Sequence, residues 1–222
     1  MPSSPTTNAK PVCDFSLENA HDGIVCGLDE VGRGPLAGPV VAACVYIPPE
    51  SRDLKFIEYI KDSKKLYESK RTLIFTDINK HCHVGIAECS PAEIDELNIL
   101  WASMKAMKRA YMNMAAEMAA KSGLTPNFAL IDGNRLPPDM PCAAQSVVKG
   151  DAKSKSIAAA SIIAKVTRDR YMAEIADAHP HYGWESNSAY PTKQHLEAIE
   201  AHGITEHHRK SFGPVRRYLE NN

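Results

Sequence analysis

A glycine-rich turn between two apolar runs constrains the fold of this chain more than any other stretch. Residues 24–28 alternate between the two sides of an extended backbone and lead into adjacent carboxylates, Asp29 and Glu30. A turn with three glycines follows, and then a nearly continuous apolar run over residues 40–47. Period-two alternation predicts a strand, and a continuous apolar run bounded by prolines predicts a buried one. The short turn between them predicts an antiparallel hairpin.

The paired carboxylates place a second constraint on this hairpin. Neighbouring side chains of a strand point to opposite faces, so Asp29 and Glu30 can serve one site only where the strand ends and the backbone turns. Two adjacent acids repel each other unless a cation lies between them. We therefore expect a divalent metal ion here, because hard cations prefer oxygen ligands.

The remaining patterns predict alternating strands and helices. Ser90, Pro91 and Glu93 form a capping box with proline in the first turn, and they open a helix that extends to about residue 121 with a possible break at Leu97 and Asn98. A later helix begins at Ser156 with small residues that permit close approach to a neighbouring sheet. Further helices are predicted over residues 68–79 and 192–201, and further strands over residues 84–88, 128–131 and 144–148. This order predicts an α/β fold with a mixed sheet flanked by helices.

Composition excludes several classes of protein. With 222 residues, 44% apolar and 24% charged, the chain can bury the core of one large domain. No apolar run reaches the ~18–20 residues that span a bilayer, so we expect a cytoplasmic protein without membrane contact. The net charge of −1 provides no general attraction to nucleic acid, but the basic run over residues 207–217 is a candidate local contact with a duplex.

Two further acids share the context of the first pair. Asp132 ends a predicted strand before a glycine, and Asp151 follows a Lys-Gly turn before a helix. If these acids converge with Asp29 and Glu30, the site holds about four negative charges, which two divalent ions would neutralise. Hydrolysis of a phosphodiester by a metal-activated water is the matching chemistry, and Mg²⁺ fits because it binds a few carboxylates and keeps its waters.

Two other interpretations fail on the sequence. Gly32, Gly34 and Ala37 resemble a dinucleotide fingerprint, but Pro39 and a strand follow where a helix is required. The cluster His81, Cys82, His83 and Cys89 resembles a zinc site. Read as a strand it places neighbouring side chains on different faces, so ordinary packing is favoured.

Five ordered motifs then identify a resemblance. They are Asp29-Glu-Val-Gly-Arg-Gly34, Asp62-Ser-Lys-Lys-Leu66, Ile131-Asp-Gly-Asn134, Val148-Lys-Gly-Asp-Ala-Lys153 and the segment from Ser156 to Asp169. Together they resemble ribonuclease HII of the bacterial type over residues 24–218. The resemblance implies a ribonuclease H-like mixed five-stranded sheet with flanking helices and a C-terminal helical extension. It also implies endonucleolytic cleavage of RNA in RNA/DNA hybrids, and cleavage 5′ to single ribonucleotides in duplex DNA that leaves 3′-hydroxyl and 5′-phosphate ends, as in ribonucleotide excision.

The resemblance assigns roles to individual residues. The cofactor would be two Mg²⁺ or Mn²⁺ ions. The glycine-arginine-glycine turn would read the 2′-hydroxyl that distinguishes RNA from DNA. Tyr190 would stack on the sugar at the RNA–DNA junction, although Ala189 replaces the glycine that the family has before it. The implied site comprises the metal-binding acids Asp29, Glu30, Asp132 and Asp151, the turn residues Gly32, Arg33 and Gly34, the candidate phosphate contacts Lys64 and Lys65, and Tyr190.

The chain is expected to consist of a short tail and one catalytic domain. We expect a flexible tail over residues 1–20 and a catalytic domain over residues 21–222 that acts as a monomer. The sister family, ribonuclease HIII, is disfavoured by Arg33 and by the short segment before Asp14. Two alternatives remain open: a hydrolase or transferase of the same fold with another substrate, such as a junction nuclease, and a hybrid-binding module without catalysis.

Overall fold

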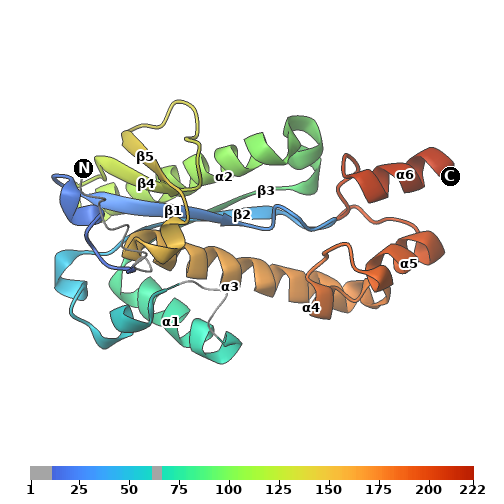
Figure 1. Cartoon of the computed structure of the whole chain (residues 1–222), viewed down its shortest axis with the longest axis horizontal. Coiled ribbons are helices and arrows are strands. Elements are labelled where there is room, and N and C mark those ends of the chain that lie inside the picture. The colour runs from blue at the N-terminus through green and yellow to red at the C-terminus, as the bar shows by residue number, and fades with distance from the viewer. Residues whose placement is uncertain (1–11, 62–66) are drawn as a thin grey trace, which may run out of the picture.

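A five-stranded mixed sheet forms the centre of the computed structural model, which describes residues 12–61 and 67–222 (Figure 1). The strand order is β3-β2-β1-β4-β5. β1, β2 and β3 are antiparallel neighbours, and β4 and β5 continue the sheet parallel to β1. The strands are β1 (Val25–Val31), β2 (Val40–Tyr46), β3 (His83–Cys89), β4 (Phe128–Asp132) and β5 (Ala143–Val147). The predicted hairpin and mixed sheet are confirmed.

Helices cover both faces of this sheet. Figure 1 shows α2 on one face and α1 with α3 on the other, and a separate apolar core fills each interface. Shorter helices continue beyond the end of α3 and form a C-terminal extension with a core of its own. The helices are α1 (Glu68–His81), α2 (Pro91–Ser122), α3 (Lys155–Ala178), α4 (Trp184–Asn187), α5 (Lys193–His202) and α6 (Gly213–Asn221).

Local sequence signals explain the course of α2. Ser90 and Glu93 make both hydrogen bonds of the predicted capping box, and Gly123 ends the helix in the left-handed region. The predicted break is present at Asn98, which has φ of 64° and ψ of 163°. The Asn98 side chain accepts hydrogen bonds from the next turn, including one of 3.0 Å from the backbone of Leu100. The Asn98 side chain thus caps the second half of the helix.

Close contact between α3 and β1 places the site. A Cβ atom on Gly27 would lie 2.2 Å from the backbone nitrogen of Ile157, so only glycine permits this approach. The small residues near the start of α3 are fully buried against the sheet, as their pattern predicted. Because α3 lies directly against β1, side chains at the end of β1 meet side chains of α3. Among the described residues, no helix is long and apolar enough to cross a membrane.

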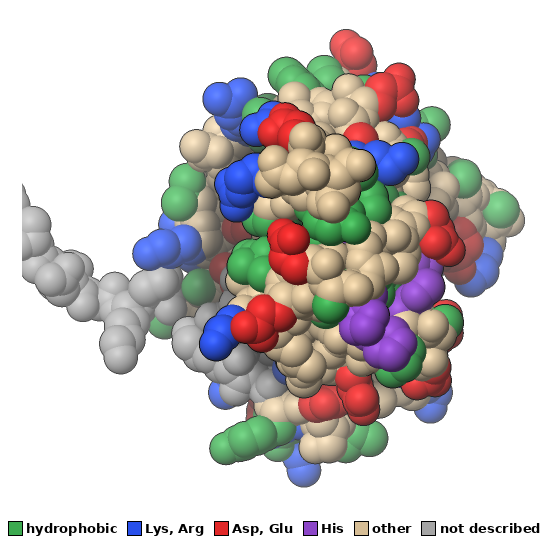
Figure 2. Space-filling view, turned by 90° about the vertical axis from the view of Figure 1, so that its right-hand side faces the viewer, with side chains coloured by type: hydrophobic (Ala, Val, Ile, Leu, Met, Phe, Trp, Pro, Cys, Tyr) green, Lys and Arg blue, Asp and Glu red, His purple; other side chains and the backbone are tan. Residues whose placement is uncertain are grey.

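The basic run over residues 207–217 is divided between surface and interior. Lys210, Arg216 and Arg217 are exposed, whereas His208 and Arg209 are buried. His208 is 1% exposed and Arg209 is 0% exposed, so both side chains lie in the interior. Figure 2 looks onto the end of the molecule that carries this region, and basic and acidic side chains are interspersed there. His208 and Arg209 therefore cannot be surface contacts with a duplex, and contact through the exposed residues of the run stays a prediction.

Candidate active site

β1 was expected to end at Asp29 and Glu30, and it extends one residue further, to Val31. Glu30 and Val31 still pair with Ala42 and Val41 of β2. Asp29 and Glu30 therefore lie on opposite faces of the sheet. Asp29 is buried, and its carboxylate accepts hydrogen bonds from the Ser161 side chain on α3 and from the backbone of Glu30. Glu30 lines a hollow that includes Leu100 and Met104 of α2.

Asp132 lies at the edge of the sheet and lines both the cavity next to Asp29 and the hollow next to Glu30. β4 runs parallel to β1 in a register that pairs Leu28 with Ile131, so Asp132 lies beside Asp29 at the same edge of the sheet. Its Oδ1 atom accepts a 2.6 Å hydrogen bond from the backbone nitrogen of Gly150. This bond fixes the turn that carries Asp151, just before α3. The sheet edge and the start of α3 thus bring all four predicted acids together.

One cavity of about 440 Å³ contains these acids. Its lining consists of Asp29, Glu30, Val31, Gly32, Arg33, Gly34, Asp132, Asp151, Ser161, Lys165 and Tyr190. A hollow of about 320 Å³ shares Glu30, Arg33 and Asp132 with it. Among the described residues, no three of the four carboxylates bring oxygens within 4.8 Å of one another. The acids therefore surround a space instead of meeting at one point.

Burial and mutual repulsion raise the pKa of the acids on β1. The pKa of Asp29 is raised well above its usual range, first by burial and then by the charges of Glu30 and Asp132. Burial also raises the pKa of Glu30, and the Arg33 guanidinium opposes that rise. Arg33 donates a 3.2 Å hydrogen bond to Glu30. Each ionised carboxylate thus makes it costlier to ionise the next one.

This donor set fits divalent cations. The four carboxylates border one open cavity, whereas Arg33 pairs with Glu30, and Lys165 pairs with Asp169 at 2.6 Å. A bound cation would lower the cost of ionising Asp29, which burial and the neighbouring acids now impose. Oxygen-only donors of this kind suit Mg²⁺ and Mn²⁺ and not softer metals.

Two glycines of the turn after β1 lie in different surroundings. Gly32 has φ of 93°, and a Cβ atom there would lie 2.3 Å from Nε of Arg168. A Cβ atom on Gly34 would lie 3.1 Å from the ring of Tyr190. Tyr190 is 50% exposed, so its ring covers the turn from the solvent side of the cavity. The structure therefore brings the predicted turn and the predicted tyrosine into contact.

Ala189 occupies the backbone region that favours glycine. Its φ is 65°, which explains physically why a glycine is the better residue at this position. The conformation is held by hydrogen bonds on both sides. The Ala189 backbone nitrogen donates to Oδ1 of Asn187 at 2.8 Å, and the Ala189 carbonyl accepts from the nitrogen of Leu36 at 2.7 Å. The alanine is accommodated, and Tyr190 keeps its place beside Gly34.

Two buried arginines hold this turn, and sequence reasoning missed both. Arg209 donates to the carbonyl oxygens of Gly32, Arg33, Pro35 and Gly38 at distances of 2.6 to 3.1 Å. Arg168 donates to the carbonyls of Ala37 and Pro39, both at 3.1 Å. Burial lowers the pKa of Arg168 and Arg209 to about 10 and about 9, so both remain charged at neutral pH. The basic run contained Arg209, but its sequence does not reveal which carbonyls it binds.

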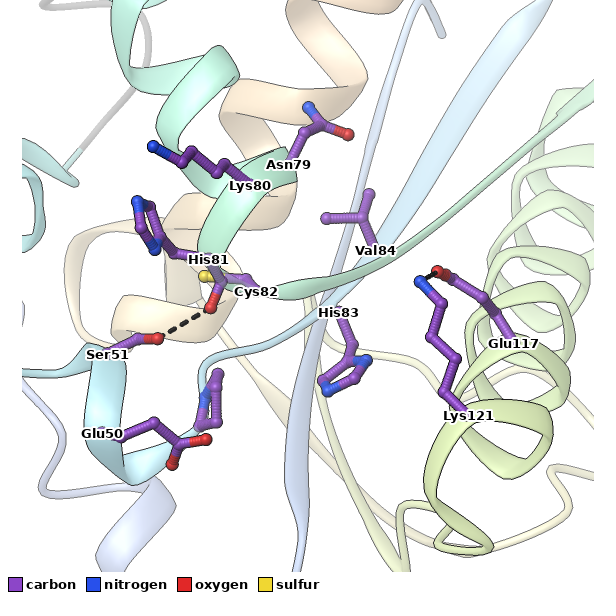
Figure 3. A pocket seen from close by; sticks show the side chains of 11 residues that line it. Glu50, Ser51, Asn79, Lys80, His81, Cys82, His83, Val84, Glu117 and Lys121 are labelled. Carbon is purple, nitrogen blue, oxygen red and sulfur yellow. Dashed lines mark hydrogen bonds and ion pairs between the residues drawn. The ribbon is translucent and has the colours of Figure 1, made fainter.

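The cysteine-histidine cluster is not a metal site. His81 ends α1, Cys82 follows as its cap, and His83 starts β3, so the reading of His81 and Cys82 as strand residues is wrong. Figure 3 shows these side chains pointing apart around a hollow of about 400 Å³. Burial raises the pKa of Cys82 to about 12, which keeps the thiol protonated. Cys89 packs in the core on the α2 face, whereas Cys82 packs in the core on the α1 face. The two thiols therefore have ordinary packing roles, as the sequence favoured.

The last predicted contacts, Lys64 and Lys65, lie outside the described residues, as do residues 1–11 of the expected tail. From residue 12 onward the N-terminal segment is described. Within it, Glu18 is 2% exposed and accepts hydrogen bonds from the Ser154 hydroxyl and the Ser156 backbone, at 2.7 and 2.8 Å. Glu18 therefore joins this segment to the start of α3.

Comparison with known proteins gives a consistent family. The sequence pattern of the family described as Ribonuclease HII matches residues 26–215. The Ribonuclease HII of Marinomonas sp. (strain MWYL1) is 52% identical over 198 residues, covering 89% of this chain and 94% of the relative. The ribonuclease H2 of Pyrococcus horikoshii OT3 is 25% identical and superposes with a TM-score of 0.70, covering 90% of this chain and 98% of that one.

A more distant structure shares the fold alone. A ribonuclease HIII described as Bst-RNase HIII, solved in complex with Mn²⁺, is 19% identical and has a TM-score of 0.68, covering 89% of this chain and 70% of that one. The mixed five-stranded sheet with flanking helices is thus the ribonuclease H-type fold that the motifs implied. Motifs, fold and sequence identity agree: the chain belongs to the ribonuclease HII family.

Proposed function

We propose that this chain is an endoribonuclease that hydrolyses the RNA strand of RNA/DNA hybrids and cuts 5′ to single ribonucleotides in duplex DNA. The products would carry 3′-hydroxyl and 5′-phosphate ends. One observation carries the proposal: four carboxylates and a backbone-only glycine turn line the same cavity. Membership of the ribonuclease HII family supports it. Such a cavity combines a place for phosphodiester hydrolysis with a place for recognising a sugar.

The acids would hold two divalent cations, Mg²⁺ or Mn²⁺. Asp29, Glu30, Asp132 and Asp151 are the residues that we assign to them. When bound, such cations activate water and stabilise the charge on the leaving oxygen of a phosphodiester. The protein contributes fixed carboxylates: Ser161 orients Asp29, Arg33 orients Glu30, and the Gly150 backbone orients Asp132. These contacts hold the donors in place before substrate arrives.

The turn would distinguish ribose from deoxyribose. At Gly32 and Gly34 no side chain separates the backbone from the cavity, so backbone groups can approach the 2′-hydroxyl, which both donates and accepts hydrogen bonds. The exposed ring of Tyr190 lies against the same turn and offers an apolar surface to the sugar. Arg33, also exposed, is available for a phosphate once cations neutralise Glu30. We further propose a cytoplasmic monomer. All six cysteines are free thiols, which supports a reducing compartment.

A cleavage assay tests this function. An RNA strand labelled at its end and annealed to DNA is incubated with the full chain, with Mg²⁺, with Mn²⁺ or with a chelator. We expect cleavage with either metal and none with the chelator. Asp132→Asn should lower the rate by at least about 10²-fold, because a metal ligand contributes several kcal/mol to the transition state. The matched control Asp139→Asn changes an exposed acid outside the cavity and should cut at the parent rate.

The outcomes separate the competing functions. Cleavage of an all-DNA duplex at a similar rate would indicate a nuclease of another substrate class. Tight hybrid binding without cleavage in either metal would indicate a binding module. Parent-level cleavage by Asp132→Asn would remove Asp132 from the catalytic site.

A further inference from the structure

A second cluster of metal-ligating side chains lies in the C-terminal extension. Within the part of the chain that the structure describes, His179, Glu206 and His207 offer three ligand atoms that all lie within 4.8 Å of one another. His179 directly follows α3, whereas Asp151 directly precedes it. Because α3 has 24 residues and rises ~1.5 Å per residue, the cluster lies roughly 36 Å along this helix from Asp151. It is therefore separate from the four-acid cavity.

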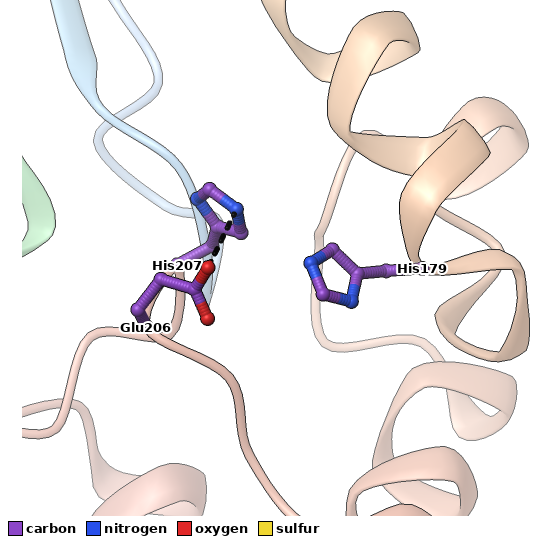
Figure 4. Close-up of side chains that lie close together, drawn as sticks. All are labelled: His179, Glu206 and His207. Carbon is purple, nitrogen blue, oxygen red and sulfur yellow. Dashed lines mark ion pairs between the residues drawn. The ribbon is translucent and has the colours of Figure 1, made fainter.

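The three side chains come from two segments and face one another. In Figure 4, His179 points from the end of α3 toward His207 and Glu206, which lie on the segment between α5 and α6. Nε2 of His207 is 3.7 Å from Oε1 of Glu206. The rings of His179 and His207 are 5.3 Å apart at an angle of 72°. Side chains from separate segments thus converge on a common point.

The surroundings hold the two rings in place. The ring of His179 packs edge-on against Trp184, at 5.5 Å between centroids. Nδ1 of His207 lies 3.4 Å from the hydroxyl of Tyr171 on α3. When Nδ1 carries the proton and donates a hydrogen bond to that hydroxyl, Nε2 keeps its lone pair for a metal ion. A hydrogen-bond partner on the second ring nitrogen is the usual arrangement for a metal-binding histidine.

The charge states also suit a cation. The Glu206 side chain is 77% exposed, so its carboxylate is ionised at neutral pH and the site is open to solvent. Two imidazoles, one carboxylate and an open position form a donor set of the kind that binds Zn²⁺. The nearby His195 and His208 are engaged with each other, with Trp184 and with Thr205.

We propose that His179, Glu206 and His207 bind a divalent transition-metal ion of the Zn²⁺ class and thereby tie the end of α3 to the segment that precedes α6. The segment continues directly into Arg209, which holds the carbonyls of the turn after β1. A metal ion bound to the cluster therefore stabilises the C-terminal extension. It also stabilises Arg209 in the position from which it holds the turn. The cluster offers two nitrogens and one oxygen as ligands, whereas the four acids of the cavity offer oxygen alone.

Calorimetric titration tests the site on the full chain. Metal-free protein is titrated with ZnCl₂ in excess Mg²⁺, and the visible absorption of added Co²⁺ reports nitrogen ligation directly. We expect one Zn²⁺ site in the parent that is lost in His179→Ala, together with the Co²⁺ band. The matched control His181→Ala changes an exposed histidine that stacks on His202 outside the cluster, and it should bind as the parent does.

Two further variants test the site with changes that are not expected to disturb folding. Glu206→Gln changes an exposed side chain and should weaken Zn²⁺ binding by at least about tenfold, and Tyr171→Phe should weaken it by about tenfold through His207. At one fixed excess of Zn²⁺, the Tm of the parent should rise by at least about 2 °C, and that of Glu206→Gln should rise by less. Absence of a Zn²⁺ site in the parent, or equal stoichiometry and affinity in the parent, His179→Ala and Glu206→Gln, would overturn the proposal.

Discussion

Arg209 donates a 2.6 Å hydrogen bond to the carbonyl oxygen of Gly32, which lies 177 residues earlier in the chain. The same guanidinium reaches Pro35 and Gly38, and the Arg209 backbone nitrogen donates to Leu36. The C-terminal segment is thus part of the support for the glycine turn at the acid cavity. Two glycines of this turn have no side chains that could hold the turn rigid. The hydrogen bonds from the buried Arg209 hold it instead.

Replacing Arg209 with lysine should loosen this turn. Lysine carries three donors on one atom and cannot reach the four carbonyls that the guanidinium fork holds. Because buried carbonyls lose their partners, we expect a loss of about 2–4 kcal/mol in the free energy of unfolding and at least about a tenfold loss in kcat/KM. Urea denaturation and cleavage kinetics measure both.

The control for Arg209→Lys is Arg216→Lys. Arg216 is 63% exposed and belongs to the same basic run, so its variant should match the parent in stability and activity. Equal behaviour of Arg209→Lys and Arg216→Lys would contradict a bracing role.

Adding one methyl group at Gly34 should impair substrate binding more than folding. The new Cβ atom would lie 3.1 Å from the Tyr190 ring, which must move by a few tenths of an ångström, and it would project between the backbone and the sugar. We expect Gly34→Ala to lower kcat/KM by about tenfold or more and to change stability by less than about 1 kcal/mol. Gly213→Ala is the control, since its Cβ atom would make an ordinary 3.7 Å contact. Equal kcat/KM in both variants would refute the close approach.

Asp29→Asn should stabilise the metal-free protein at neutral pH. The folded-state pKa of Asp29 is raised by burial and then by Glu30 and Asp132, so above the usual carboxyl range the folded state binds more protons than the unfolded state. The parent therefore loses stability as pH rises from about 4 through the raised pKa, and the variant lacks this loss. Urea denaturation in chelator at pH 5 and pH 8 measures it. A variant less stable than the parent at pH 8 would contradict the account.

The buried His208 should make the fold sensitive to acid. Burial and then the neighbouring His195, His207 and His179 lower its pKa to about 3, so between pH 6.5 and 3 only the unfolded state takes up this proton. Stability therefore falls as pH falls through that window. In chelator, the parent should lose about 2 kcal/mol more than His208→Gln between pH 7 and pH 5. Parallel losses in the two proteins would show that His208 does not carry this dependence.

The sequence predicted those parts of the fold that depend on contacts between residues close together in the chain. The capping box at Ser90 was recognisable because both of its hydrogen bonds lie within one turn. The break at Asn98 was recognisable because asparagine tolerates a left-handed φ. Asp132 was found because a strand-end acid before glycine is a local signal, and the parallel register then placed it beside Asp29.

Other features depend on partners that are distant in sequence. β1 was expected to end at Asp29 and Glu30, and pairing of Val31 with Val41 extends it by one residue. The partner strand β2 supplies these backbone hydrogen bonds, which the sequence of β1 alone does not reveal. Arg209 belongs to a basic run that looked solvated, and only the folded turn shows its carbonyl partners. Helix α6 (Gly213–Asn221) was not predicted from its own residues, because a short helix gains its stability from packing, here through Val215.

Cleavage of a duplex that contains one ribonucleotide decides whether this chain recognises the 2′-hydroxyl and cuts beside it. The full chain is incubated with Mg²⁺ and an end-labelled DNA duplex carrying one ribonucleotide, beside the same duplex made wholly of DNA. The account predicts a single cut on the 5′ side of the ribonucleotide with a 3′-hydroxyl end, no cut in the all-DNA duplex, and loss of the cut in Asp132→Asn. Equal cleavage of both duplexes, or an unchanged rate in Asp132→Asn, would contradict it.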